Sequence, residues 1–115
     1  FSEDRPKVAS VLLNRLKRDM PLQADATVQY AVGKVGDGWW KKDLTREDLK
    51  INSPFNTYVQ YGLPPMAISN PGLDTLKAAA FPAKTNDLYY LSSKDGRMHY
   101  AENFEEHSQN IEKYL

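Results

Sequence analysis

The strongest constraint on the fold is a short polar link between two stretches that both show helical periodicity. The first stretch covers residues 4–18, and the second begins at Asp25 and ends at Gly33. In each stretch apolar residues recur at three- and four-residue spacing, which predicts an amphipathic helix with one face in a core. Pro21 disfavours helical geometry at Met20, so the first helix is expected to end near that residue.

Within the link, polar and apolar side chains alternate, and the polar ones are Gln23, Asp25 and Thr27. Polar groups on a short link between two packed helices are held in place by rigid elements, which favours a role in ligand binding. Two structural alternatives stay open at this point. The carboxylate of Asp25 could cap the second helix, and the amide of Gln23 could satisfy backbone groups of the link.

The middle of the chain predicts two further short helices. Thr45 and the acidic residues after it are typical of a helix N-terminus and predict one or two turns. Asn70 is expected to cap a helix that has Pro71 in its first turn and ends near Phe81. The residues predicted to face the core from this helix are Leu73, Leu76 and Ala80.

The last third of the chain predicts a hairpin and a closing helix. Residues 88–92 and 98–100 are rich in strand formers and flank a Lys-Asp-Gly turn. Asn103 and Glu106 approximate a capping box, and the helix after them carries on one face Phe104, His107, Ile111 and Leu115. The predicted fold class is therefore α+β, with mainly short helices and one late antiparallel β-hairpin, in a single domain covering residues 1–115.

Two segments lack periodicity. Residues 33–43 contain three of the six glycines together with Trp39 and Trp40, and predict a surface loop. Residues 51–72 hold four of the seven prolines, and a long irregular segment in a compact domain is usually functional or disordered. Its large apolar residues favour burial, so we expect an ordered wall of a groove; they are Phe55, Tyr58, Tyr61, Leu63, Met66 and Ile68.

Composition and motifs exclude several function classes. Fifteen basic residues balance fifteen acidic ones, so no net charge indicates binding to nucleic acid or to an anionic membrane surface. The chain has no cysteine, and no apolar run approaches the roughly 20 residues that cross a bilayer. No glycine-rich phosphate loop is present, and His99 and His107 lack the spacing of a metal motif. No cofactor and no metal ion is expected, and both histidines are expected to have packing or capping roles.

The remaining candidate surface is polar, aromatic and neutral. Amide and hydroxyl groups beside aromatic rings suit sugars, which present hydroxyls at their edges and C–H groups on their faces. The candidate substrate-binding residues are Gln23, Asp25, Thr27, Asn56, Thr57 and Tyr58. Asn56, like Gln23, has the alternative role of satisfying backbone groups of its own loop.

Several motifs follow one another along nearly the whole chain. They read VASV at 8–11, NRL at 14–16, MPLQADATV at 20–28, SPFNTY at 53–58, GLPP at 62–65, ISNPG at 68–72 and LKAA at 76–79. Their order and spacing continue into residues 88–90, His99 and the Glu106-His107 pair. In this combination the sequence resembles the YceG-like (MltG-type) endolytic murein transglycosylases. It departs from them at Ala26, where the family commonly has Pro, and at Phe55, where Tyr is usual.

The resemblance implies an enzyme that cuts peptidoglycan glycan strands between N-acetylmuramic acid and N-acetylglucosamine and leaves 1,6-anhydromuramyl ends. One carboxyl group would protonate the glycosidic oxygen and then take the proton from the C6 hydroxyl that closes the ring. The family's catalytic Glu is expected a few residues before Phe1, and Glu3 and Asp4 are not expected to replace it. We therefore expect the carboxyl-terminal portion of a YceG-like catalytic domain, inactive alone, which forms a lysozyme-like cleft with an upstream segment.

By the same resemblance, the six candidate residues would line a glycan-facing wall, and Gln23→Ala or Asn56→Ala would reduce cleavage with thermal stability nearly unchanged. The implied partners are peptidoglycan glycan strands and cell-wall synthases, with membrane contact only through an anchor outside this chain. The implied location is the extracytoplasmic face of the bacterial inner membrane. The alternative is a non-catalytic glycan-binding or scaffold module of a cell-wall synthesis complex.

Overall fold

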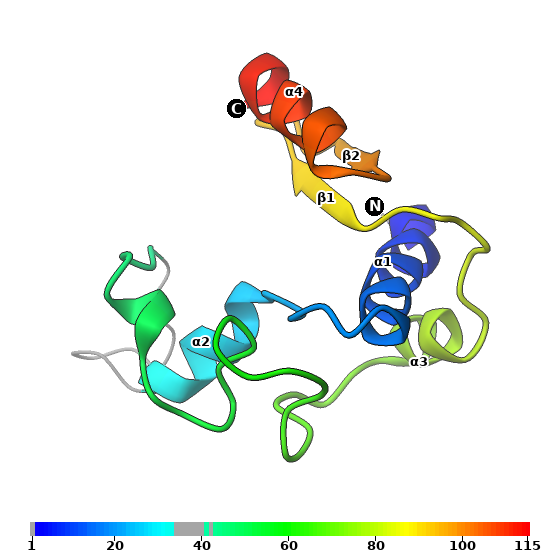
Figure 1. The fold of residues 1–115 in the computed structure, drawn as a ribbon. Coiled ribbons are helices and arrows are strands. Elements are labelled where there is room, and N and C mark those ends of the chain that lie inside the picture. Colours follow the sequence, from blue (N-terminus) through cyan, green and yellow to red (C-terminus); the bar gives the residue numbers. More distant parts are fainter. Residues whose placement is uncertain (1, 34–40, 42) are drawn as a thin grey trace. The chain divides into compact units, whose positions relative to one another are not determined.

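The computed structural model describes residues 2–33, 41 and 43–115 (Figure 1). Over these residues it combines short helices with one two-stranded antiparallel sheet, so the predicted α+β class is confirmed. The loop that carries Trp39 and Trp40 lies outside the described residues. None of the helices in the described part of the chain has both the length and the apolar character needed to span a membrane.

The chain forms two compact units. The terminal unit comprises Phe1–Arg15 and Pro71–Leu115, and the central unit comprises Leu16–Asn70. That residues 1–115 form a single domain stays a prediction.

Helix α1, Arg5–Lys17, follows a single 3-10 turn, η1, at Ser2–Asp4. Its inward face is partly polar, because Ser10 and Arg15 are as buried as Val11. A buried polar side chain needs hydrogen-bond partners, which here come from another segment of the terminal unit.

That segment is the extended chain at residues 83–88, and the polar face of α1 holds it in place. The side chain of Asn14 donates to the carbonyls of Thr85 at 2.9 Å and Asp87 at 3.0 Å. The hydroxyls of Ser10 and Thr85 lie 2.7 Å apart, and Arg15 donates through Nε to the carbonyl of Leu88 at 2.7 Å. Asn14 and Arg15 of α1 therefore hold the segment that leads into the hairpin.

Helix α3, Leu73–Ala80, begins later than predicted. Its N-cap is Gly72, so the prediction of Asn70 as the cap is wrong. Leu73 and Leu76 are 67% and 53% exposed, whereas Ala78 is buried. The predicted stripe of Leu73, Leu76 and Ala80 is thus incorrect, because the helix turns its small residues rather than its leucines toward α1.

The hairpin pairs β1, Tyr89–Ser92, with β2, Met98–Ala101, as predicted. Helix α4, Phe104–Tyr114, lies across this hairpin (Figure 1). From this helix, the His107 ring stacks on Tyr89 with ring centroids 4.8 Å apart, and the Tyr114 ring stacks on His99 with ring centroids 3.5 Å apart. The register explains these contacts, because Tyr89 and His99 lie on the same face of the two-stranded sheet.

The start of α4 follows the prediction, and its apolar face is only partly covered. Asn103 accepts a hydrogen bond from the Glu106 backbone N–H at 2.8 Å, which confirms the cap. The residues Phe104, Ile111 and Leu115 stay exposed at 64%, 40% and 64%. Aromatic stacking on the hairpin, rather than an aliphatic stripe, therefore decides which side of the helix packs.

In the central unit, helix α2 runs from Asp25 to Val32 and ends at Gly33, as predicted. Gly33 has φ +76° and donates its N–H to the carbonyl of Gln29 at 3.0 Å. The predicted turn near Thr45 is the 3-10 turn η2, Asp48–Lys50, and Thr45 and Asp48 cap each other reciprocally. The Lys41 ammonium, 2.6 Å from the Asp48 carboxylate, is the main reason that the pKa of Asp48 is lowered.

Residues 51–72 contain neither helix nor strand, as the sequence indicates. Their apolar residues are only partly covered. The rings of Tyr30 and Phe55 pack with centroids 4.9 Å apart. Tyr61, Leu63 and Met66 are 70%, 71% and 64% exposed, so the expectation of burial is wrong for these three residues.

Candidate functional site

The polar link and the loop at residues 53–58 lie against each other in the central unit. Gln23 donates its backbone N–H to the carbonyl of Thr57 at 3.2 Å. The N–H of Ala24 donates to the Thr57 hydroxyl at 3.0 Å. Two segments more than 30 residues apart in sequence are thus joined by one bond between backbone groups and one from backbone to side chain.

Two threonines form the buried centre of this contact. Thr27 is 4% exposed and Thr57 is 1% exposed, and their hydroxyl oxygens lie 2.8 Å apart. The hydroxyl of Thr27 donates to the carbonyl of Ala24 at 2.7 Å. These side chains therefore face the link and the loop, and the prediction that they face a glycan is corrected: buried hydroxyls with filled hydrogen-bond positions hold the two segments together.

Asn56 is likewise an interior residue, with no exposed surface. Its side-chain nitrogen donates to the carbonyls of Leu49 at 3.0 Å and Ile51 at 2.9 Å, and its side-chain oxygen accepts from the N–H of Tyr58 at 2.9 Å. An amide used in this way has no surface to offer to a ligand. The alternative role of Asn56, satisfying backbone groups of its loop, replaces the predicted glycan contact.

Three of the predicted residues lie at the surface beside this buried centre. Gln23 and Asp25 are exposed and Tyr58 is half-buried. The Tyr58 hydroxyl donates to the Asp25 carboxylate at 2.5 Å, which joins the loop to the first turn of α2. The cap of α2 is Ala24 and involves no side chain, so the alternative of Asp25 as a helix cap is not what the structure shows.

The backbone of Gln23 is strained. Its φ of +52° lies in the left-handed region, which a residue with a side chain rarely occupies. Such a conformation costs about 1–2 kcal/mol and persists only where the surroundings impose it. Here the Gln23 N–H is bound to the carbonyl of Thr57, which helps to hold this conformation, and the side chain is exposed. Nothing in the composition of the link signals this conformation.

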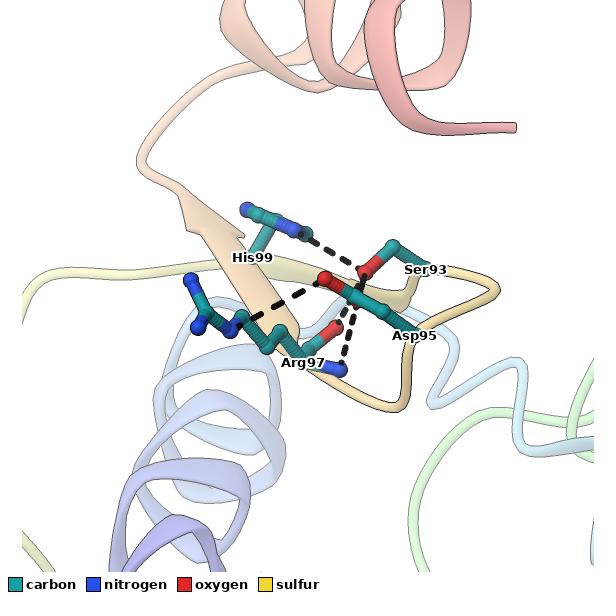
Figure 2. A network of polar contacts seen from close by, with 4 residues as sticks. All are labelled: Ser93, Asp95, Arg97 and His99. Carbon is teal, nitrogen blue, oxygen red and sulfur yellow. Dashed lines mark hydrogen bonds and ion pairs between the residues drawn. The ribbon is translucent and has the colours of Figure 1, made fainter.

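A second polar cluster lies at the hairpin turn of the terminal unit (Figure 2). The Ser93 hydroxyl donates to the Asp95 carboxylate and lies 3.3 Å from Nε2 of His99. The N–H of Arg97 donates to Asp95 at 3.1 Å. The Ser93 hydrogen bond, more than the Arg97 backbone, lowers the pKa of Asp95. Because the serine proton is directed at a carboxylate, this cluster stabilises the turn and is not arranged as a nucleophile with its base.

The two histidines pack as predicted, each with its ring stacked on a tyrosine. Burial, followed by the positive charge of Arg15, lowers the pKa of His107. In the described residues, no three histidine or acidic side chains gather in a way that could hold a metal ion.

The terminal unit also contains a cavity of about 530 Å³ between α1 and α3. Its walls are mainly apolar, formed by Val8, Ala9, Leu12, Ala78, Ala79 and Met98. At its edge, Asp4 accepts a hydrogen bond from the Tyr100 hydroxyl at 2.8 Å, and burial followed by this contact raises the pKa of Tyr100. The polar residues at this cavity, Asp4, Arg5 and Thr75, stand beside a mainly apolar wall, which suits a sugar less well because its hydroxyls need partners. The Gln23–Asp25–Tyr58 surface is the better candidate for a sugar.

Comparison with known proteins gives consistent matches. The sequence model of the YceG-like family matches residues 1–113. The chain is 45% identical over 112 residues to the endolytic murein transglycosylase of Bacillus subtilis (strain 168), covering 97% of this chain and 30% of that protein. It is 36% identical over 115 residues to the protein of the same name from Streptococcus pneumoniae serotype 2 (strain D39 / NCTC 7466), covering 99% and 21%.

Structural comparison agrees. A crystal structure of a yceG-like protein from Listeria monocytogenes matches with a TM-score of 0.85 and 44% sequence identity, over 92% of this chain and 33% of that one. The chain therefore spans a third or less of the length of the proteins described here. Motifs, sequence and fold lead to the same conclusion: the chain belongs to the YceG-like family.

Proposed function

We propose that this chain supplies the glycan-binding wall of an endolytic murein transglycosylase, which cleaves the bond between N-acetylmuramic acid and N-acetylglucosamine. Two relatives that match nearly the whole chain carry that name. The single observation that supports the proposal is the contact of the two loops, in which Tyr58 bonds Asp25 and the exposed Gln23 lies two residues before Asp25.

The three surface groups offer the chemistry that a sugar requires. The Gln23 amide can donate to a carbonyl of an N-acetyl group and accept from a hydroxyl, and the Tyr58 ring offers an apolar face to the C–H groups of a pyranose. Asp25 accepts a hydrogen bond from the Tyr58 hydroxyl and can accept a second one from a sugar hydroxyl. These contacts would fix a strand in register along the wall.

Cleavage without water needs one group that gives a proton to the glycosidic oxygen and then removes one from the C6 hydroxyl. Exposed Asp25 already accepts a hydrogen bond from Tyr58, so we assign it to binding and not to proton donation. Asp4 likewise accepts from Tyr100. We assign the acid to the glutamate that the family resemblance implies ahead of Phe1, and the lysozyme-like cleft to this wall combined with that segment.

The second candidate function is a glycan-binding or scaffold module without catalysis. The same surface favours it, because Gln23, Asp25 and Tyr58 are all assigned to binding and none of them to proton transfer. In either case we infer peptidoglycan as the ligand and cell-wall synthases as partners. The corresponding location is the outer side of the inner membrane, where peptidoglycan lies, with any anchor outside these residues.

The experiment is a digest of purified glycan strands with the full-length protein, followed by mass spectrometry of the products. Anhydromuramyl ends are expected, and Gln23→Ala is expected to reduce their rate of formation while the thermal unfolding temperature stays within a few degrees. Asn52→Ala, which changes an exposed amide of the other loop, is the matched control. Glycan binding without any cleavage would favour the second candidate, and hydrated reducing ends would show a hydrolase.

A further inference from the structure

We propose that Thr27 and Thr57 are positioning residues, which set the direction of Gln23 and Asp25 through a closed ring of hydrogen bonds around Ala24. This inference rests on the proposed function, because it assigns these threonines a role in presenting the glycan-binding wall. Neither threonine needs to touch a glycan for this role. Both lie in the interior, at 4% and 1% exposure.

The direction of every proton in the ring follows from the geometry. The Thr27 hydroxyl donates to the carbonyl of Ala24 at 2.7 Å, so its single proton is committed. The contact of 2.8 Å between the two hydroxyls must then use the proton of Thr57. The Thr57 oxygen in turn accepts the N–H of Ala24 at 3.0 Å. The ring therefore starts at the N–H of Ala24 and returns to the carbonyl of the same residue.

The backbone of Thr57 completes the arrangement. Its N–H donates to the Thr27 hydroxyl at 3.3 Å, and its carbonyl accepts the N–H of Gln23 at 3.2 Å. Both hydroxyls are thus used as donor and as acceptor, and hydrogen bonds linked in this way polarise and strengthen one another. Three backbone groups of the link are therefore bound: the N–H of Gln23 by the Thr57 carbonyl, and the N–H and carbonyl of Ala24 by the two threonine hydroxyls.

Ala24, whose backbone groups these hydrogen bonds hold, lies between Gln23 and Asp25. Ala24 is the N-cap of α2, so the orientation of its two peptide planes decides where Gln23 leaves the link and where Asp25 begins the helix. The left-handed backbone of Gln23 requires an external constraint, and the bond from its N–H to the Thr57 carbonyl and the ring at Ala24 lie on either side of the Gln23–Ala24 peptide. A small error in the position of a binding group can reduce turnover about 100-fold. We therefore expect catalysis to depend on two hydroxyls that are hidden from the substrate.

The test compares Thr57→Val, which keeps the shape and removes the hydroxyl, with Thr57→Ser, which keeps the hydroxyl, in the full-length protein. Thr57→Val is expected to lower kcat/KM for glycan cleavage by about 10- to 100-fold, and Thr57→Ser is expected to restore most of it. Thr27→Val and Thr27→Ser form the second pair, for use if the first valine variant does not fold. Thr85→Val, which breaks the hydroxyl pair with Ser10 in the terminal unit, is the matched control and should leave kcat/KM unchanged.

Hydrogen exchange measured by mass spectrometry separates positioning from general loss of structure. In Thr57→Val, amides of Gln23 and Ala24 should exchange faster while those of α2 from Val28 onward keep their protection. Faster exchange at the link with unchanged kcat/KM would overturn the positioning role, and unchanged exchange at the link would overturn the ring itself. A wild-type protein that cleaves no glycan would overturn the proposed function instead, and the exchange data would then decide the ring alone.

Discussion

Replacing Asn56 with alanine should loosen its loop strongly. The substitution removes two side-chain donors, to Leu49 and Ile51, and the acceptor for the Tyr58 N–H. A typical hydrogen bond contributes about 1 kcal/mol net, and a buried group left without a partner costs about 1–3 kcal/mol. Because penalties at neighbouring groups are not additive, we expect a loss of about 2–4 kcal/mol in the free energy of local opening, rather than the sum of all penalties.

Native-state hydrogen exchange of the full-length protein measures this loss directly. At 1.4 kcal/mol for each factor of ten, exchange of amides in residues 49–58 should become roughly 30- to 700-fold faster. Asn52→Ala provides the control, because that asparagine is exposed in the same segment and should change exchange little. Exchange that rises less than about fivefold in Asn56→Ala, together with weaker glycan binding, would refute the structural role and support a ligand contact instead.

Three further predictions concern other residues. Tyr58→Phe removes the hydroxyl that bonds Asp25, and because the pair is at the surface, thermal stability should change little while glycan affinity falls several-fold. Equal glycan affinity of the variant and the wild-type protein would contradict the proposed glycan-binding wall. Burial lowers the folded-state pKa of His107 below its ordinary 6.5, so its contribution to the free energy of unfolding should be fully present above pH 6.5 and be lost as the pH falls below that value. In His107→Phe, which keeps a ring on Tyr89, the thermal unfolding temperature should lose this pH dependence. Gly33→Ala should destabilise by about 1 kcal/mol because φ is +76° there, whereas Gly72→Ala, at a negative φ, should not; equal unfolding midpoints for the two variants would contradict this reasoning.

Local signals in the sequence predicted the elements that depend on nearby residues. The end of α2 at Gly33 and the start of α4 at Asn103 follow from backbone freedom and capping within one helical turn. The hairpin around Gly96 follows from its turn residues and flanking strand formers. In each case the partners are at most a few residues apart, so periodicity and capping rules suffice.

Long-range contacts decided the features that the sequence did not predict. The Asp25 carboxylate could have capped α2, but the Tyr58 hydroxyl, 33 residues away, takes it instead. Asn56 is buried because the carbonyls of Leu49 and Ile51 converge on it, which no local pattern reveals. A helical stripe such as Leu73 and Leu76 shows which side is apolar but not whether another element covers it.

The sequence predicted the family and the contact between the two loops, but not which of the six candidate residues are exposed and which are buried. Six residues of similar chemistry separate, in the structure, into surface groups and interior groups. Hydroxyl and amide side chains serve both purposes equally well. Only burial distinguishes them, and burial follows from packing rather than from residue type.

The clamp of α1 on residues 83–88 has a consequence for how the chain is made. Ser10 and Thr85 are 75 residues apart in the sequence, and all residues of the central unit come between them along the chain. During synthesis, Asn14 and Arg15 leave the ribosome long before the carbonyls that they bind, so their side chains are hydrogen-bonded to water until residues 85–88 are made. The central unit, whose contacts are closed by Asn70, is free to fold in that interval.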